Sequence, residues 1–170
     1  MAAKKFLRLV AGKLNEVLGV VTSAGAGNDG DLVALDAAGK LDVSLLPAGV
    51  GQNTVAATAS EALAANDFVN FHDVSGVLNV RKADASNGRE AVGFVRVAVA
   101  SSAAATVFIS GNVVTGLSGL TPGQRRYLSA TAGVSTATPV TTTAHTHQLL
   151  GYAATATSIA FEPEDPILVA

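Results

Sequence analysis

The stretch AVGFVRVAV, residues 91–99, is the clearest β-strand signal in the chain. Side chains alternate between the two faces of a strand, so Phe94 and Arg96 lie on one face and Gly93 and Val95 on the other. Apart from the charge at Arg96, both faces are apolar, as in a strand whose sheet is covered on both sides. Arg96 indicates that its face is partly solvated or meets a partner. The stretch therefore predicts a largely buried strand in a β-rich domain.

Short runs of Val, Ile, Phe and Thr continue from residue 53 onward, separated by turn formers at roughly the 8–12-residue spacing of all-β domains. The pairs Asn87-Gly88 and Pro122-Gly123 supply the backbone angles that tight turns need. We expect an all-β fold, with an antiparallel β-barrel or sandwich over residues 52–170. Besides residues 91–99, the expected strands are residues 54–57, 68–72, 78–82, 106–110, 113–115, 126–129, 148–153, 158–162 and 167–170.

Residues 1–51 follow a different pattern, in which one phrase occurs twice. AGKLNEVL at residues 11–18 and AGKLDVSL at residues 38–45 are identical at five of eight positions, and each follows an apolar run. An apolar run, a glycine-containing turn and a second apolar run describe a β-hairpin. The repeat therefore predicts two short β-hairpins in an extended N-terminal arm.

An amphipathic helix is the alternative for the first copy of the phrase. Four apolar residues fall at helical spacing there, namely Phe6, Val10, Leu14 and Val17. Gly12 would lie inside that helix and would cost about 1 kcal/mol relative to Ala. Together with the duplication, this cost favours the hairpins.

Two short hairpins cannot bury the apolar side chains of the arm by themselves. A two-stranded hairpin alone is also only marginally stable in water. We therefore expect the arm to dock on another surface. The candidate partner-contact residues are Phe6, Leu7, Leu9, Val10, Leu14, Val17, Leu32, Val33, Leu35, Leu41, Leu45 and Leu46.

Composition points in the same direction. Of the 170 residues, 49% are hydrophobic and only 14% are charged, against roughly 25% charged in ordinary domains. The net charge of −2 gives no electrostatic footprint for nucleic acid or for an anionic membrane. The chain has no cysteine, so disulfides and thiolate chemistry are excluded. A chain so poor in charge is expected to cover much of its surface with other subunits.

No membrane partner is expected either. Residues 97–124 carry no formal charge, but their Gly, Ser, Thr and Asn content is wrong for a spanning helix, which needs about 20 mostly apolar residues. The N-terminus resembles a signal peptide superficially. Arg8, Lys13 and Glu16 interrupt what would be its apolar region, so we expect no signal peptide.

The glycine-rich segment GAGNDG, Gly25 to Gly30, matches the G-x-G-x-x-G pattern of dinucleotide sites. Such a site needs a following helix, and here two aspartates that would repel phosphate come instead. We interpret the segment as a flexible linker.

Four side chains offer oxygen ligands for calcium, namely Asn28, Asp29, Asp31 and Asp36, but their register fails the EF-hand pattern. These residues are expected to bond nearby backbone in turns.

Three further groups of side chains could in principle carry chemistry. His145 and His147 could hold a metal on the axis of a trimer, yet no Cys or carboxylate nearby completes a site, so no metal is expected. Ser118 in GLSGL is not a nucleophile elbow. Several other side chains could be imagined as acid–base or substrate-clamping groups: Asp73 beside His72, Glu162, Glu164, Asp165, Arg125 and Arg126. We expect Arg125 and Arg126 to be a surface pair, or a contact to an acidic partner, rather than a substrate clamp. We expect no enzymatic activity and no cofactor.

The arm LRLVAGKLNEV and TSAGAGNDGDLVALDAAGKLDVSLLPAGVG resembles the N-terminal module of many tailed-bacteriophage virion proteins, in which an ALD–GKLD–SLLP phrase precedes a β domain. Three later phrases are similar to the β module of the same group: VGFVRVAVASSAAATVFISG, GLSGLTPGQRRYLSATAGVSTATP and QLLGYAATATSIAFEPEDPILVA. The group includes capsid decoration (cement) proteins and head-fibre-like or tail-fibre-like proteins. The resemblance covers nearly the whole chain, but its motifs are structural and carry over no ligand-binding residue.

This resemblance implies a decoration protein that is made in the bacterial host cytoplasm and added to the outside of the capsid. It implies the major capsid protein and further copies of this chain, in a homotrimer, as partners, with residues 1–51 as the capsid-binding arm. The alternative is a tail or fibre component whose β domain binds a receptor. Receptor sites for carbohydrate usually use exposed aromatics, and this chain has no Trp and only Tyr127 and Tyr152.

Overall fold

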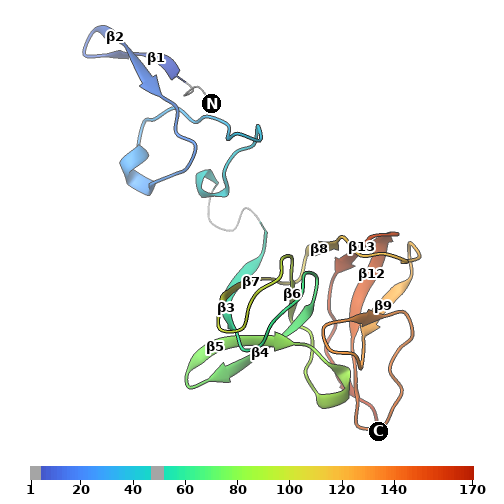
Figure 1. The fold of residues 1–170 in the computed structure, drawn as a ribbon. Helices are drawn as coiled ribbons and strands as arrows, with labels where there is room; N and C mark the ends of the chain where they lie inside the picture. Colours follow the sequence, from blue (N-terminus) through green and yellow to red (C-terminus); the bar gives the residue numbers. More distant parts are fainter. Residues whose placement is uncertain (1–4, 47–51) are drawn as a thin grey trace. The chain divides into compact units, whose positions relative to one another are not determined.

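The computed structural model describes residues 5–46 and 52–170, and the chain separates into two compact units, Met1–Gly51 and Gln52–Ala170 (Figure 1). Each unit is described by itself. The expected all-β fold is confirmed, because the described residues form strands and three short 3-10 turns but no α-helix. None of the helical segments among these residues is long and apolar enough to cross a membrane.

The first unit begins with the expected hairpin. Strands β1 (Lys5–Val10) and β2 (Lys13–Leu18) pair antiparallel along their whole length. The two residues between them, Ala11 and Gly12, both have positive φ (50° and 79°), as a type I′ hairpin turn requires. The helical alternative is therefore wrong, because the glycine that would weaken a helix is the residue that closes this turn.

The second copy of the phrase, residues 38–45, does not form the expected hairpin. The Asp36 carboxylate accepts hydrogen bonds from two of the backbone amides that follow it, each at 2.8 Å. The segment then ends in a 3-10 turn, η2 (Val43–Leu45), whose preceding residue Asp42 accepts from the Ser44 amide at 2.9 Å. Asp and Ser offer the backbone local partners that compete with a strand ladder. The hydrogen bonds that Asp36 and Asp42 accept from nearby amides therefore explain why the repeat in sequence is not a repeat in structure.

The second unit, the β domain, combines a closed barrel with a five-stranded sheet. The barrel order is β3-β5-β4-β6-β7 and the sheet order is β10-β9-β12-β13-β8. Within the barrel β3 pairs parallel with β5, whereas the other described pairings of the domain are antiparallel. The barrel strands are β3 (Thr54–Ala59), β4 (Phe68–Val74), β5 (Val77–Lys82), β6 (Gly93–Val95) and β7 (Ala104–Phe108). The sheet strands are β8 (Asn112–Thr115), β9 (Arg125–Leu128), β10 (Ser135–Thr136), β12 (Leu149–Thr155) and β13 (Ser158–Phe161).

Three short elements complete the domain: the strand pair β11 (Thr146–His147) and β14 (Ile167–Leu168), and the 3-10 turn η3 (Ala85–Asn87). Most expected strands appear within a few residues of their expected bounds. The exception is the stretch 91–99, of which only β6, three residues long, is strand. Beyond β6 the chain bends at Arg96, whose guanidinium lies over the Phe108 ring at 4.1 Å and donates to Gln52 Oε1 at 2.8 Å.

Strand β6 belongs to two hydrophobic cores. Phe94 points into a core between the barrel and the sheet, where its ring lies 5.6 Å from that of Phe161 in β13. Val95 points the other way, into the barrel interior, where it packs with Val80 and Val107. The expectation of a strand covered on both faces is thus confirmed, and alternation along one strand serves both cores.

Candidate functional site

The apolar residues expected to contact a partner lie at the surface of the first unit. Val17 and Leu45 are half-buried, and the other ten are exposed: Phe6, Leu7, Leu9, Val10, Leu14, Leu32, Val33, Leu35, Leu41 and Leu46. Three more exposed apolar residues, Leu18, Val21 and Val43, were missed by the sequence analysis. Across the described residues 5–46, Ala34 is the one buried hydrophobic side chain. This unit therefore presents its apolar residues to the outside.

The hairpin concentrates these residues on one of its two faces. The β1–β2 register places Lys5 opposite Leu18, Leu7 opposite Glu16, and Leu9 opposite Leu14. Opposed residues of an antiparallel pair point to the same side. We name this side the leucine face, and it consists of Lys5, Leu7, Leu9, Leu14, Glu16 and Leu18. Its four leucines are 72%, 67%, 71% and 62% exposed in chain order.

The opposite face of the hairpin is turned toward its own unit. The Phe6 ring packs so closely on Gly19 that a Cβ there would lie 2.6 Å from it. The Arg8 guanidinium reaches the Asp31 carboxylate at 3.9 Å. A parallel bridge between Val20 and Val33 ties the ends of the intervening loop together. These contacts leave the leucine face as the outward side of the hairpin.

The glycine-rich segment is not the flexible linker that the sequence suggested. It forms the 3-10 turn η1 (Gly25–Asn28). The Asn28 side chain makes one hydrogen bond with a residue before this turn and one with a residue after it. Its Oδ1 accepts from the Ala24 amide, and its Nδ2 donates to Asp31 Oδ2 at 3.1 Å. The expectation that these residues bond nearby backbone in turns is confirmed for Asn28 and Asp36, whereas Asp31 bonds the Asn28 side chain. The prediction of a linker is wrong because Asn and Asp side chains can order a glycine-rich loop.

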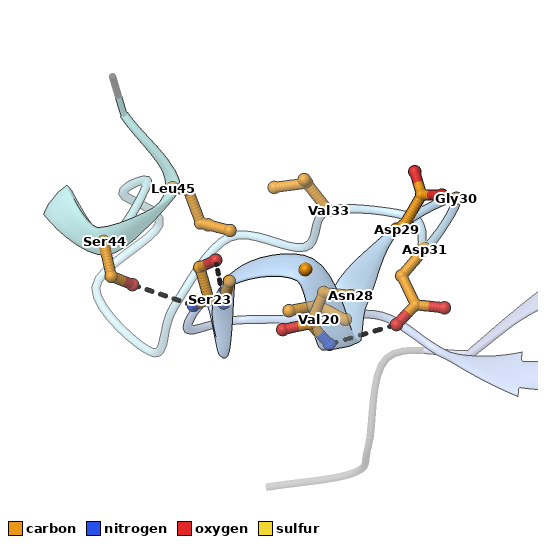
Figure 2. Close-up of a pocket in the computed structure, with 11 residues that line it drawn as sticks. Val20, Ser23, Asn28, Asp29, Gly30, Asp31, Val33, Ser44 and Leu45 are labelled. Carbon is orange, nitrogen blue, oxygen red and sulfur yellow. Dashed lines mark hydrogen bonds between the residues drawn. The ribbon is translucent and has the colours of Figure 1, made fainter. Parts of the chain in front are cut away.

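The loop encloses a hollow of about 340 Å³ between η1 and η2. Figure 2 shows Ser44 from η2 reaching across it, where the hydroxyl accepts from the Ser23 amide at 2.8 Å. Asp29 and Asp31 line one side of the hollow and Val33 another. The segment that follows the glycines runs into the bridge at Val33 rather than into a helix, so the geometry of a dinucleotide site is not formed.

The histidines of the β domain do not gather with other ligands. The His147 ring lies 5.3 Å from the Tyr127 ring, and its Nδ1 is 3.4 Å from the carbonyl oxygen of Val140. Over residues 5–46 and 52–170, no three His, Cys, Asp or Glu side chains come close enough together to hold a metal ion.

One pair relevant to catalysis was missed by the sequence analysis. Ser60 Oγ and His72 Nε2 are 2.8 Å apart. Burial, followed by the charges of Arg81 and Arg89, lowers the pKa of His72. No hydrogen-bond partner for His72 Nδ1 occurs in the described parts of the chain, so the third group that orients a catalytic histidine is not in place. The pair is thus a Ser–His hydrogen bond without the orienting carboxylate of a triad.

The two adjacent arginines differ in environment. Arg125 is exposed, as expected, with its guanidinium 5.9 Å from the centre of the Tyr152 ring. Arg126 turns inward, and donates to the Ser135 carbonyl at 3.0 Å. Burial lowers the pKa of Arg126. The expectation of a surface pair is therefore right for Arg125 and wrong for Arg126, because alternation along β9 sends the two side chains to opposite sides.

No protein-family model matches this chain, and no curated protein is significantly similar to it. Among solved structures, the chain is similar to the head fibre gp8.5 N base in bacteriophage phi29. The TM-score is 0.46 and the sequence identity 10%, over 71% of this chain and 95% of that chain.

Proposed function

We propose that this protein is a structural component of a tailed-phage virion that decorates the outside of the capsid. The N-terminal unit binds the major capsid protein, and the β domain is displayed. The observation that carries the proposal is the exposure of ten of the twelve predicted contact residues in a unit with one buried hydrophobic side chain among those described. The resemblance of its phrases to phage virion modules supplies the direction.

The β domain supports these separate roles of the two units because it has its own hydrophobic cores. One cluster fills the barrel, and another fills the space between the barrel and the sheet. A domain with complete cores does not need the arm in order to fold. The arm, by contrast, has the composition of a binding surface, since large exposed apolar patches mark sites of interaction.

A homotrimer is the proposed assembly. The low charge of the whole chain and exposed apolar residues on the β domain, such as Val97 and Ile167, suit contacts between copies. Mass measurement of the full chain in solution tests this directly. A trimer is expected, and a monomer at working concentrations would contradict this part of the proposal.

Deletion of residues 1–51 tests the function. Capsids are purified from a phage that lacks this protein, and the full chain or the fragment 52–170 is added back. The full chain is expected to decorate the shells and the fragment to remain unbound, while circular dichroism and thermal melting show the fragment folded. Full occupancy of the shells by the fragment would overturn the capsid-binding role of the arm.

A tail or fibre component with a receptor-binding β domain is the second candidate. Tyr152 is partly exposed beside Arg125, an aromatic–cation pair of the kind that sugar sites can use. Labelled antibody on intact particles separates the two candidates, since decoration places label over the whole head. Label restricted to the tail or to one vertex, together with specific binding on a glycan array, would favour the second candidate.

A further inference from the structure

We propose that the leucine face of the β1–β2 hairpin docks on an uncharged, apolar patch of the major capsid protein. This inference rests on the proposed function and makes it specific to one face of one hairpin. Among the exposed apolar residues of the arm, it singles out Leu7, Leu9, Leu14 and Leu18, which the register brings to one side.

The two faces of the hairpin differ in what they contact. Phe6 and Arg8 point to the inward face and meet Gly19 and Asp31 of their own unit. The four leucines point outward and keep between 62% and 72% of their surface exposed. Phe6 and Val10 on the inward face are 37% and 41% exposed, so the leucine face is the more open of the two surfaces and the better placed for a partner.

The charges on the leucine face indicate the chemistry of that partner. Lys5 Nζ and Glu16 Oε2 pair at 3.1 Å, so the face carries no net charge. The pair is half-exposed, and a surface pair of this kind contributes little to folding. A phosphate or anionic lipid partner would compete for Lys5 and leave Glu16 facing a like charge. An apolar protein surface offers neither member of the pair a competing charge, so the pair stays intact, with Glu16 opposite Leu7 in the register.

The area of the face decides between a second copy of this chain and a repeated shell. Full burial of a leucine removes roughly 60–120 Å² of apolar surface, so four leucines about two-thirds exposed offer roughly 160–320 Å². A stable pairwise interface needs about 800 Å² on each side. Two copies meeting through this face alone fall short. A shell that repeats its patch lets several arms of one oligomer bind at once, and this multiplies weak contacts.

The test compares two double variants of the full chain. Leu7→Ser with Leu14→Ser removes the centre of the leucine face. Val74→Ser with Val77→Ser is the control, because these paired residues at the end of the β4–β5 hairpin are 46% and 54% exposed but lie in the β domain. Binding to undecorated shells is measured at several protein concentrations. The first variant is expected to lose at least tenfold in affinity, and the control is expected to bind as the unaltered chain does.

Crosslinking keeps the test decisive if the serines disturb the hairpin. The chain has no cysteine, so a single introduced cysteine carries a unique photoreactive label. A label at Leu9→Cys, on the leucine face, is expected to capture the major capsid protein. A label at Val10→Cys, on the inward face of the same strand, is expected to capture this chain itself. Equal capture of the capsid protein from both positions would overturn the proposal.

The outcomes separate this inference from the proposed function. If the fragment 52–170 does not bind but the Leu7→Ser, Leu14→Ser variant binds fully, the arm binds through another face and only this inference fails. If the full chain itself does not bind, the proposed function fails. If the fragment binds fully, the capsid-binding role of the arm fails, and this inference fails with it. If the double variant breaks up the oligomer in the absence of shells, the face belongs to contacts between copies and the inference is overturned.

Discussion

Gly93 shows how one residue fixes the geometry of the β domain. A Cβ at this position would lie 2.5 Å from Val107 Cγ1 and 2.7 Å from the Phe108 carbonyl oxygen, both in β7. Its φ is ordinary, so the requirement for glycine arises from close approach between strands rather than from backbone conformation. The neighbouring Phe94 and Val95 reach their separate cores because β6 can lie this close to β7.

Gly93→Ala is therefore expected to destabilise the β domain. The added methyl group must push β7 away or distort β6, and overpacking of this kind costs about 1–3 kcal/mol. Thermal unfolding followed by tyrosine fluorescence measures the loss, since Tyr127 and Tyr152 both lie in the β domain. Gly27→Ala is the control, because a Cβ there meets no atom within 4 Å. Equal melting of the Gly93→Ala variant and the unaltered chain would show that β7 shifts freely.

The two AGKL phrases show what an element needs beyond its pattern. In the first copy, the residues after the turn are Asn15, Glu16 and Val17, and they continue as β2. In the second, Asp42 and Ser44 replace Asn15 and Val17, and the Asp42 carboxylate accepts from the Ser44 amide as η2 begins. A β-branched residue favours a strand, whereas Asp and Ser favour caps and turns. The four shared letters do not fix the turn either, because Ala11 and Gly12 both have positive φ whereas in the second copy Gly39 does and Ala38 does not.

Ala11→Asn is expected to stabilise the β1–β2 hairpin. Ala11 has φ of 50°, a left-handed conformation that is unfavourable for alanine and tolerated by asparagine. Asn-Gly is also the preferred pair for a type I′ turn. We expect a gain of about 0.5–1 kcal/mol, which appears as roughly two- to fivefold slower hydrogen exchange of hairpin amides.

Ala11→Val provides the opposite control, because a β-branched side chain at positive φ is strained. Exchange in the hairpin should then become faster, with the β domain unchanged. If both substitutions leave exchange as it is, the turn conformation does not limit the stability of the hairpin.

Much of this architecture could be predicted from sequence, for identifiable reasons. Alternation and turn residues located most strands and identified the first hairpin, because both signals are local. The sequence predicted a barrel or a sandwich without deciding between them. The parallel β3–β5 pair and the bend at Arg96 were not predicted, since they depend on partners far along the chain such as Gln52 and Phe108. For the candidate site, ten of the twelve named apolar residues are exposed, and their contact with a partner stays a prediction. Their division between two hairpin faces needed the β1–β2 register.

Strand β6 links the barrel and the sheet of the β domain, because it contributes Phe94 to the core between them and Val95 to the core inside the barrel. Phe94 also lies 5.5 Å from Phe108 and 6.5 Å from Phe68, so barrel strands supply part of the core that the sheet covers. Neither half can lose its packing without exposing apolar surface of the other. Two structural halves that share a hydrophobic core are therefore expected to unfold as one cooperative unit.

Phe94→Ala tests this cooperativity. Removal of the ring from a closed core is expected to cost about 3–5 kcal/mol. Tyrosine fluorescence reports the sheet half, where Tyr127 and Tyr152 lie, and hydrogen exchange at Val80 and Val107 reports the barrel half. Both probes should show the same loss, although Phe94 points away from the barrel interior. Val95→Ala makes the reciprocal test, because its cavity opens inside the barrel and the tyrosines should still detect it. A barrel that keeps its protection while the tyrosines report an unfolded sheet would mean that β6 does not couple the halves.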